Sequence, residues 1–422
     1  MHIKNFDPYD FSKKVVEGIP VYYKNLPWSP CTHIHLVFSV GAFNDPKNKE
    51  GLAHFLEHMI GAGSPMLPNK KAVKEFNRLY MLNSRNAYTS YNITSYTGKC
   101  LPENFGEVVT KLLDQVKNPF IREEDVERER KIITQESWGV YKNQKFINYI
   151  KEFTQNLYRN HEKSRIYSPL GWPESIEGIS QNDLKKFHFE NYVKENFSIF
   201  IVGSIQNHDL NILSKLVKTM PKGKKAIKNE GQAKKPLKNR IEKTSDEIGD
   251  PKKQLEFSIC RFMPRLKEKD EYTAYELSGL LYDILFERLR TEHSLCYGVR
   301  VPFRNFKSFS ETGISVQTSS ENLNLVEKEV WKVIDEIKSN AWKDRFEILN
   351  KLTIDQIKSN ERSTYDITYN ASKDFVLTNK IESLKKIPDG HKKVTYNDIK
   401  KLTKKIFDKQ YILTEIIFPS EK

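Results

Sequence analysis

The sequence predicts an α+β fold of two homologous domains, each a mixed sheet with helices packed on one side. Short β-type runs precede and separate long amphipathic segments in both halves of the 422 residues. The chain is also too long for one small core. Two pairs of matching stretches, at nearly the same spacing, indicate that the halves are copies of one plan.

The first half begins with a β-type run at 15–23 (VVEGIPVYY), which predicts a hairpin around Gly18, and continues with a strand at 33–43. Helical periodicity follows near 50–60, 70–80, 102–117, 122–142 and 181–194. Such mixed strand and helix runs are typical of α+β domains.

Two pairs of stretches carry the repeat. One pair is SQNDLKKFHFENYVKENFSIFIVG, from Ser180, and TYNDIKKLTKKIFDKQYILTEIIF, from Thr395, which align without a gap. Each opens with Ser or Thr and has Asp three residues later, a capping-box pattern that begins a helix. The other pair is HLVFSVGAF and QLEFSICRF. The alternative is chance similarity between amphipathic helices. The repeat predicts domains at 1–220 and 251–422, joined by a basic, solvated linker at 221–250.

Composition favours a soluble cytoplasmic protein. The start of the chain lacks the apolar core of a signal peptide, and no run approaches the roughly 20 apolar residues of a membrane span. The four cysteines have no CxxC spacing and indicate reduced thiols. The net charge of +14 is spread widely, without a nucleic-acid-binding motif. We therefore expect neither a nucleic acid nor a membrane as partner.

The stretch HFLEH, at 54–58, indicates a metal site, and the alternative is two surface histidines that share a helix by chance. On a helix, His54 and His58 share one face with Glu57, and an apolar face lies opposite. Two histidines at i and i+4 can bind one zinc ion, while the glutamate reaches a water without binding the metal. This is the HxxEH order of the inverzincins, the reverse of HExxH.

A catalytic zinc usually has a third protein ligand. In EEDVERERKIITQESWGVYKN, Glu129 and Glu136 fall on the same helical stripe as Val126, Ile133 and Val140. Carboxylates on an apolar stripe need compensation. A metal would supply it, and Arg128 and Arg130 would be the alternative source.

With these residues the chain resembles the pitrilysin family of zinc peptidases, which includes insulin-degrading enzyme and the mitochondrial processing peptidases, and looks like a short, two-domain, bacterial-type member. The resemblance implies one Zn²⁺ per chain, bound by His54, His58 and Glu136, with Glu57 as general base. It implies that Glu129 supports the site behind the ligands. RNAYTSYNITSY (85–96) resembles the family's edge strand, in which Asn86 and Ala87 would contact the backbone of an extended peptide.

In the second half, LRTEHSLCYGV is similar to the family segment whose arginine and tyrosine contact substrate near the zinc, here Arg290 and Tyr297. The alternative for Tyr297 is a core or strand-edge aromatic. The region corresponding to HFLEH, YTAYELSGLLYDIL, has no histidine. Two features depart from the family: MLNSRNA approaches the edge strand without a glycine, and Cys296 precedes the tyrosine.

The resemblance implies a zinc endopeptidase for unstructured peptides or peptide precursors, acting in a closed chamber. This chain has length for a half-shell only, so we expect it to pair into a clamshell dimer. A homodimer is expected, and a heterodimer with a homologous subunit remains open. A non-catalytic scaffold subunit is the alternative function, although the intact set of His54, Glu57, His58 and Glu136 speaks against it.

Overall fold

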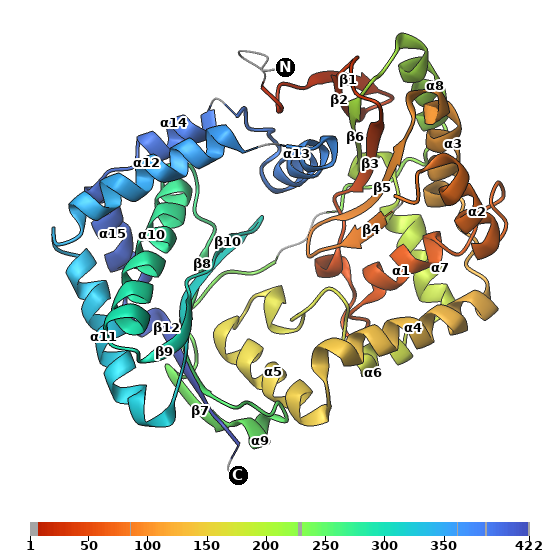
Figure 1. The fold of residues 1–422 in the computed structure, drawn as a ribbon. Coiled ribbons are helices and arrows are strands. Elements are labelled where there is room, and N and C mark those ends of the chain that lie inside the picture. The colour runs from red at the N-terminus through yellow and green to blue at the C-terminus, as the bar shows by residue number, and fades with distance from the viewer. Residues whose placement is uncertain (1–6, 85, 227–229, 361, 385, 421–422) are drawn as a thin grey trace. The chain divides into compact units, whose positions relative to one another are not determined.

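The structure is a computed structural model that describes residues 7–84, 86–226, 230–360, 362–384 and 386–420. The chain forms two compact units (Figure 1). The first comprises residues 1–140, 168–229 and 361–384, and the second comprises 141–167, 230–360 and 385–422. Each unit has its own sheet and hydrophobic core, so each is described by itself.

The first unit is built on a six-stranded sheet with the order β1-β2-β6-β3-β5-β4. Strands β2 and β6 are parallel, and the other neighbours are antiparallel. The strands are β1 (Ser12–Val16), β2 (Ile19–Asn25), β3 (Thr32–Phe38), β4 (Asn86–Thr89), β5 (Thr94–Cys100) and β6 (Phe197–Gly203). Strand β4 therefore forms one edge of the sheet, as the family resemblance implies for the stretch that contains Asn86 and Ala87.

The helices of this unit are α1 (Leu52–Ile60), α2 (Lys70–Tyr80), α3 (Phe105–Lys117), α4 (Glu123–Tyr141), α6 (Pro173–Glu177), α7 (Gln181–Asn191), α8 (Asn207–Val217) and α13 (Thr364–Thr378). Five of them match predicted helices. The segment expected near 102–117 begins with a 3₁₀ turn, Pro102–Asn104, before α3. The strand expected over 33–43 ends at Phe38, and a 3₁₀ turn follows at Ala42–Asn44.

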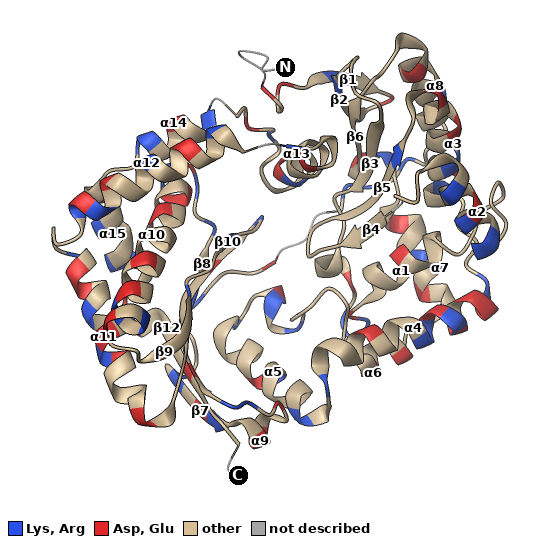
Figure 2. Cartoon of the chain, viewed as in Figure 1, with Lys and Arg blue, Asp and Glu red and all other residues tan. Residues whose placement is uncertain are grey.

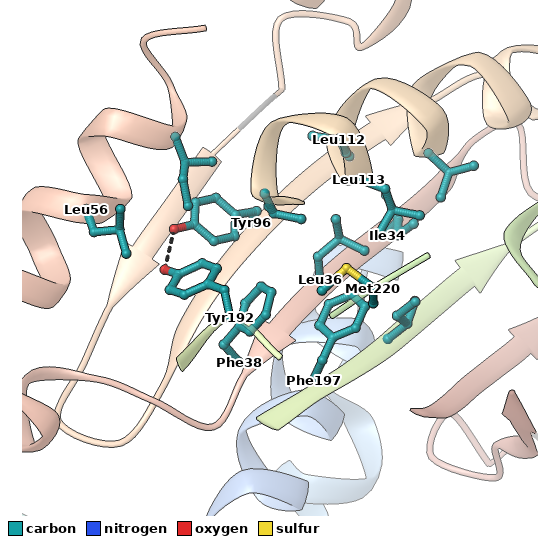
Figure 3. Packing of buried hydrophobic residues seen from close by; sticks show 14 of the residues in the cluster. Ile34, Leu36, Phe38, Leu56, Tyr96, Leu112, Leu113, Tyr192, Phe197 and Met220 are labelled. Carbon is teal, nitrogen blue, oxygen red and sulfur yellow. Dashed lines mark hydrogen bonds between the residues drawn. The ribbon is translucent and has the colours of Figure 1, made fainter. Parts of the chain in front are cut away.

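Strand β3 explains how the core of the first unit is arranged. Side chains alternate between the faces of a strand, so Ile34, Leu36 and Phe38 share one face. They pack in the core with residues of α1, α3 and α7 (Figure 3). The hydroxyls of Tyr96 and Tyr192 lie 2.7 Å apart within this packing. Most helices of the unit thus cover one face, as predicted.

The opposite face of this sheet carries polar residues and is covered by α13, a helix from the C-terminal half. His33 Nδ1 lies 2.6 Å from Thr364 Oγ1. The rings of Tyr22 and Phe375 lie 5.0 Å apart. The first unit is therefore not built from the N-terminal half of the chain alone, and the sequence did not predict this.

The sheet of the second unit has the order β10-β11-β8-β12-β7, with β9 also paired to β11. Strands β7 and β12 are parallel and the rest are antiparallel, so the topology repeats that of β4-β5-β3-β6-β2. The repeated topology agrees with an internal duplication. The strands are β7 (Arg240–Thr244), β8 (Leu255–Pro264), β9 (Cys296–Arg300), β10 (Phe303–Asn305), β11 (Phe309–Thr318) and β12 (Ile412–Phe418).

The helices of the second unit include α5, which comes from the N-terminal half. The hydroxyl of Tyr149 on α5 donates a hydrogen bond to Glu415 on β12, so the two halves of the chain exchange one helix each. The helices are α5 (Gln144–Leu157), α9 (Ser245–Ile248), α10 (Lys269–Leu285), a π-helical segment (Phe286–Glu292), α11 (Leu323–Ile337), α12 (Lys343–Ser359), α14 (Lys386–Lys392) and α15 (Tyr396–Ile406).

Both predicted capping boxes are present. The Ser180 and Thr395 hydroxyls accept hydrogen bonds from the backbone amides of Asp183 and Asp398, and both carboxylates bond back. Within the expected linker, 221–250, β7 and α9 form because Ile241 and Ile248 are buried. The boundaries of the duplicated domains stay a prediction, because units defined by packing need not coincide with units of duplication.

The α+β prediction with two mixed sheets is confirmed. Basic side chains are spread over many elements of both units (Figure 2). In the described part of the chain, no helix is both long and apolar enough to cross a bilayer.

Candidate metal centre

Helix α1 carries HFLEH, and its start is fixed by local structure. Gly51, which precedes the helix, has φ 99°, and a Cβ at this position would lie 2.7 Å from the Leu170 carbonyl oxygen. The Asp45 carboxylate accepts hydrogen bonds from the backbone amides of Gly51 and Ala53, each at 2.8 Å. These donors lack partners within the helix, so Asp45 caps it.

The apolar face of α1 is fully buried, as the winding of the sequence predicts. Leu52, Phe55, Leu56 and Met59 belong to the core of the first unit. Burial of this face leaves the two histidines together on the other side, with ring centroids 4.8 Å apart. The hydrophobic core thus determines where the imidazoles point.

The structure brings His54, His58 and Glu136 together. Glu136 Oε2 lies 3.9 Å from His54 Nε2 and 3.7 Å from His58 Nε2. One ligand atom from each of the three residues lies within 4.8 Å of the others. Helix α4 therefore supplies the third group of the predicted set, from a position far along the chain from α1.

These distances fit a shared metal ion better than hydrogen bonds. An N–H···O hydrogen bond spans about 2.7–3.2 Å, which is shorter than both contacts to Glu136. Tetrahedral ligands about 2.1 Å from Zn²⁺ lie about 3.4 Å from one another. Two imidazole nitrogens and one carboxylate oxygen are also a donor set that zinc accepts. The chemistry of these donors and their spacing, within 4.8 Å of one another, therefore fit a zinc ion once the side chains close around it.

The predicted apolar stripe on α4 holds only in part. Val126, Glu129 and Ile133 are buried, but Val140 is 36% exposed, where the chain leaves the first unit. The side chain of Glu136 is 43% exposed. The need to compensate a buried charge therefore applies to Glu129 and not to Glu136.

Glu129 lies behind the cluster and is almost fully buried. Its Oε2 lies 3.5 Å from His58 Nδ1, and its Oε1 lies 2.6 Å from Lys70 Nζ. Burial alone would raise the pKa of Glu129, but hydrogen bonds and charges from His58 and Lys70 lower this pKa to about 2. Arg128 contacts the same carboxylate at 3.4 Å, whereas Arg130 pairs with Glu127. Of the two expected arginines, only Arg128 compensates Glu129.

The two histidines differ in their electrostatic surroundings. Burial, and then the charge of His58, lowers the pKa of His54 to about 3. For His58 burial also lowers the pKa, but the hydrogen bond to Glu129 and the charges of Glu57, Glu136 and Glu129 outweigh it, so this pKa is raised. A metal ligand must be neutral imidazole, which His54 already is at neutral pH.

Glu57 lies on α1 beside the cluster and contacts the edge strand. Its Oε2 accepts a hydrogen bond of 2.7 Å from the hydroxyl of Thr89, the last residue of β4. Asn86 and Ala87 open the same strand and pair with β5. The edge strand expected to hold a peptide thus touches the side chain expected to act as base.

The glycine-free approach to β4 has a left-handed backbone. Leu82 and Asn83 both have φ 52°. Such a conformation costs about 1 kcal/mol outside glycine. Arg85, the first residue of the predicted edge-strand motif, lies outside the described residues.

Arg290 and Tyr297 lie in the second unit and not on the elements of the cluster. Arg290 is in the π-helical segment, and its guanidinium donates a hydrogen bond to the backbone carbonyl of Tyr297. Tyr297 is 63% exposed on β9, which argues against a core aromatic. Cys296 beside it is partly buried and forms no disulfide.

Sequence reasoning missed three residues around the cluster, Asp45, Lys70 and Thr89. Asp45 precedes α1 by several residues, so no capping pattern marks it. Lys70 opens α2, and its contact to Glu129 depends on how two helices pack. Thr89 is two residues past Ala87 in RNAYTSYNITSY, and the alternation of a strand could have marked it as sharing a face with that residue.

Comparison with known proteins agrees with this fold. Two models of one peptidase family match the chain, "Insulinase (Peptidase family M16)" over residues 21–169 and "Peptidase M16 inactive domain" over 178–349. Among solved structures, a protease from Helicobacter pylori has a TM-score of 0.80 at 20% identity, over 97% of this chain and 99% of that one. The periplasmic protease PqqL from Escherichia coli has a TM-score of 0.82 at 16% identity, over 97% of this chain and 48% of that one.

Sequence relatives give the same result. A zinc protease of Rickettsia bellii that has not been characterised is 28% identical over 197 residues, 47% of each chain. A probable mitochondrial-processing peptidase subunit beta of Schizosaccharomyces pombe is 28% identical over 193 residues, 46% of this chain and 41% of that protein. The chain thus spans about half the length of the relatives it matches.

The fold and both family models are those of a peptidase family whose relatives include proteins named as zinc proteases. The chain belongs to peptidase family M16, which confirms the resemblance to the pitrilysin-type peptidases.

Proposed function

We propose that this chain is a zinc-dependent endopeptidase for unstructured peptides, with His54, His58 and Glu136 as the ligands of one Zn²⁺. One observation carries the proposal. Three donor atoms that suit zinc lie within 4.8 Å of one another, and Glu57, on the same helix as two of them, is not one of the three. A carboxylate next to a metal site, but not bound to the metal, is what general base catalysis requires.

When bound, zinc would polarise the scissile carbonyl and make an attacking water more acidic. Glu57 takes the proton of that water as it attacks, and returns the proton to the leaving amine. The Glu129 carboxylate faces Nδ1 of His58 at 3.5 Å and favours a proton on that nitrogen, so Nε2 of the ring is left to bind the metal. Lys70 and Arg128 hold Glu129 in its ionised form.

The substrate binds as an added strand on the free edge of β4. Within the described residues β4 pairs with β5 alone and forms an edge of the sheet, where an extended chain can add as a further strand. Main-chain hydrogen bonds to Asn86 and Ala87 give affinity, and pockets for alternate side chains give selectivity. This mode accepts an extended chain and excludes folded domains.

We place Arg290 and Tyr297 in the same reaction, as donors to the developing oxyanion or to the neighbouring substrate carbonyl. The exposed phenol of Tyr297 supports a role in contacts to another molecule. In the assembly we propose, two half-shells close a chamber, and the partner's Arg290 and the partner's Tyr297 complete each zinc site. A homodimer suffices, because both sets of residues are on one chain, and a heterodimer is the alternative.

The shared-site proposal has a direct test. A Glu57→Gln chain and a Tyr297→Phe chain are expressed separately and together. Each should be nearly inactive alone, and the mixture should regain part of the wild-type rate. No recovery in a mixture that forms stable dimers would exclude sites shared between copies.

A second candidate function is a non-catalytic scaffold or partner subunit. The match of residues 178–349 to the family's inactive-domain model favours it. The intact cluster in the first unit disfavours it, because a scaffold needs no zinc ligands and no Glu57.

We keep the cytoplasm as the proposed location, and the four cysteines, none in a disulfide, support it. PqqL of Escherichia coli is described as periplasmic, so cell fractionation with a tagged chain is the test.

The proposed activity is tested with a mixed peptide library. Wild-type protein and the Glu57→Gln variant are incubated with it, and the products are compared by mass spectrometry. Internal cleavage by the wild type alone supports the endopeptidase. Equal product patterns from both proteins, or none from either after zinc loading, would leave the scaffold as the better account.

A further inference from the structure

The hydroxyl of Thr89 is directed at the side chain that we propose as general base. Thr89 Oγ1 lies 2.7 Å from Glu57 Oε2, a short contact between a hydroxyl and a carboxylate. The two residues come from different elements, the end of β4 and the last part of α1. Nothing in the zinc cluster requires this contact, since neither residue belongs to the set of donors.

The donors and acceptors around Thr89 show that its hydroxyl donates this hydrogen bond. A hydroxyl has one proton to donate. Thr94, opposite Thr89 in the β4–β5 pair, has its hydroxyl 3.5 Å from Thr89 Oγ1, but it donates to the backbone carbonyl of Val40 at 2.9 Å. Thr94 is buried and held by that bond. The hydroxyl proton of Thr89 is therefore available for the hydrogen bond to Glu57.

The register of the strands fixes the direction of this donor. Asn86 pairs with Thr97 at one end of β4, and Thr89 pairs with Thr94 at the other. As a β-branched residue, Thr89 has few χ1 rotamers in a strand. Its hydroxyl thus holds one position relative to α1, whereas a glutamate side chain on a helix is flexible by itself.

We propose that Thr89 is a positioning residue, whose hydroxyl holds the Glu57 carboxylate in the orientation that takes the proton from the attacking water. The inference rests on the proposed function for Glu57 and adds a residue to that site. It also ties the base to the strand that receives the peptide, because Thr89 and the contact residues Asn86 and Ala87 belong to the same four-residue strand.

The test compares Thr89→Val, Thr89→Ser and the control Thr312→Val. Valine keeps the shape and β propensity of threonine but removes the donor, and serine keeps the donor. Thr312 lies on β11 of the second unit, and its hydroxyl donates to the backbone carbonyl of Pro302 rather than to a carboxylate. We expect Thr89→Val to lower kcat at least about 10-fold, as part of the 10²–10⁴-fold of general base catalysis. KM should change less than about 2-fold, Thr89→Ser should keep kcat within about 3-fold, and Thr312→Val should match the wild type.

Two measurements separate positioning from a structural role. The affinity for Zn²⁺, measured by chelator competition, should be the same in Thr89→Val and the wild type. A fluorescent peptide should bind equally well to Glu57→Gln and to Glu57→Gln with Thr89→Val, and the added change should not slow residual cleavage. Weaker peptide or zinc binding, or an equal loss of kcat in Thr89→Ser, would overturn the proposal.

Crystal structures of zinc-loaded wild type and Thr89→Val test the same contact without turnover. The Glu57 carboxylate should be ordered against Thr89 in the wild type, and rotated or disordered in the variant. An unchanged Glu57 overturns the proposal whether or not the protein cleaves peptides. An inactive wild type with the expected change at Glu57 would instead count against the endopeptidase function alone.

Discussion

The carboxylate of Glu129 lies 3.5 Å from Nδ1 of His58, while Glu136 lies near Nε2 of the same ring. Each ring nitrogen of His58 therefore has its own carboxylate. Glu129 is buried and ionised, and it selects the tautomer with the proton on Nδ1. Glu136 is half exposed, on the side of the ring where a metal would be bound.

The first prediction concerns Glu129→Gln. An amide is a weaker acceptor for the His58 proton and no longer balances Lys70. We expect the affinity for Zn²⁺ to fall by about 10–100-fold. Chelator competition measures it, and Glu127→Gln is the control, because Glu127 is exposed on the same helix. Equal zinc affinities in the two variants would contradict the supporting role of Glu129.

The second prediction concerns Lys70→Met. This change leaves the buried Glu129 with only the longer contacts to Arg128 and His58 among the contacts described above. Because Lys70 is itself half exposed, we expect a modest loss of roughly 1 kcal/mol in the stability of the zinc-free first unit. Denaturant unfolding measures it, with the exposed Lys74 of the same helix mutated to Met as control. No difference between these two variants would show that the pair is not needed.

The third prediction is a pH dependence in the second unit. Burial raises the pKa of Glu415 to about 7, against the hydrogen bond from Tyr149, and Glu256 adds to the rise while Lys252 opposes it. Between about pH 4.5 and 7, Glu415 therefore keeps its proton in the folded state but has lost it in the unfolded state. The contribution of this group to the free energy of unfolding is fully present below pH 4.5 and is lost as the pH rises to 7.

We therefore expect Glu415→Gln to remove a fall in stability of roughly 2–3 kcal/mol between pH 4.5 and 7. Urea unfolding of wild type and variant at pH 5 and pH 8 measures it. Compared with the wild type, the Glu415→Gln variant should have a higher free energy of unfolding at pH 8, and this advantage should be absent at pH 5. Parallel pH profiles would exclude Glu415 as the titrating group.

The fourth prediction concerns a buried histidine–carboxylate contact outside the candidate metal centre. His391 Nδ1 lies 2.6 Å from Glu276 Oε1, and both side chains are buried between α14 and α10. His391→Leu leaves the carboxylate buried without this partner, which costs about 3 kcal/mol or more. Hydrogen exchange in the second unit should show the loss. Lys392→Leu is the control, since Lys392 is exposed on the same helix, and equal effects of both changes would contradict it.

Much of the candidate metal centre was predictable because helical spacing alone brings its groups together. His54, Glu57 and His58 share a face on any helix, and the apolar residues of α1 occupy the opposite face, which packs into the core of the first unit. Glu129 and Glu136 are seven residues apart on α4, so one stripe predicts both. The spacing does not predict how deeply each carboxylate is buried. Glu129 is buried, and Glu136 is not.

The contacts between elements were not predictable from one sequence. Thr89 reaches Glu57, and Lys70 reaches Glu129, through the packing of elements whose relative placement has no local signal. The exchange of α5 and α13 between the units has the same cause. Amphipathic periodicity tells which face of a helix is buried, but not which sheet it covers.

Zinc binding tests the central claim most directly. The metal-free wild type and the His58→Ala and Glu136→Gln variants are titrated with Zn²⁺ in parallel. The bound metal is then quantified by elemental mass spectrometry. We predict one Zn²⁺ per chain in the wild type and a large loss of affinity in each variant. A wild type that binds no zinc, or variants that bind it as tightly as the wild type, would contradict the account.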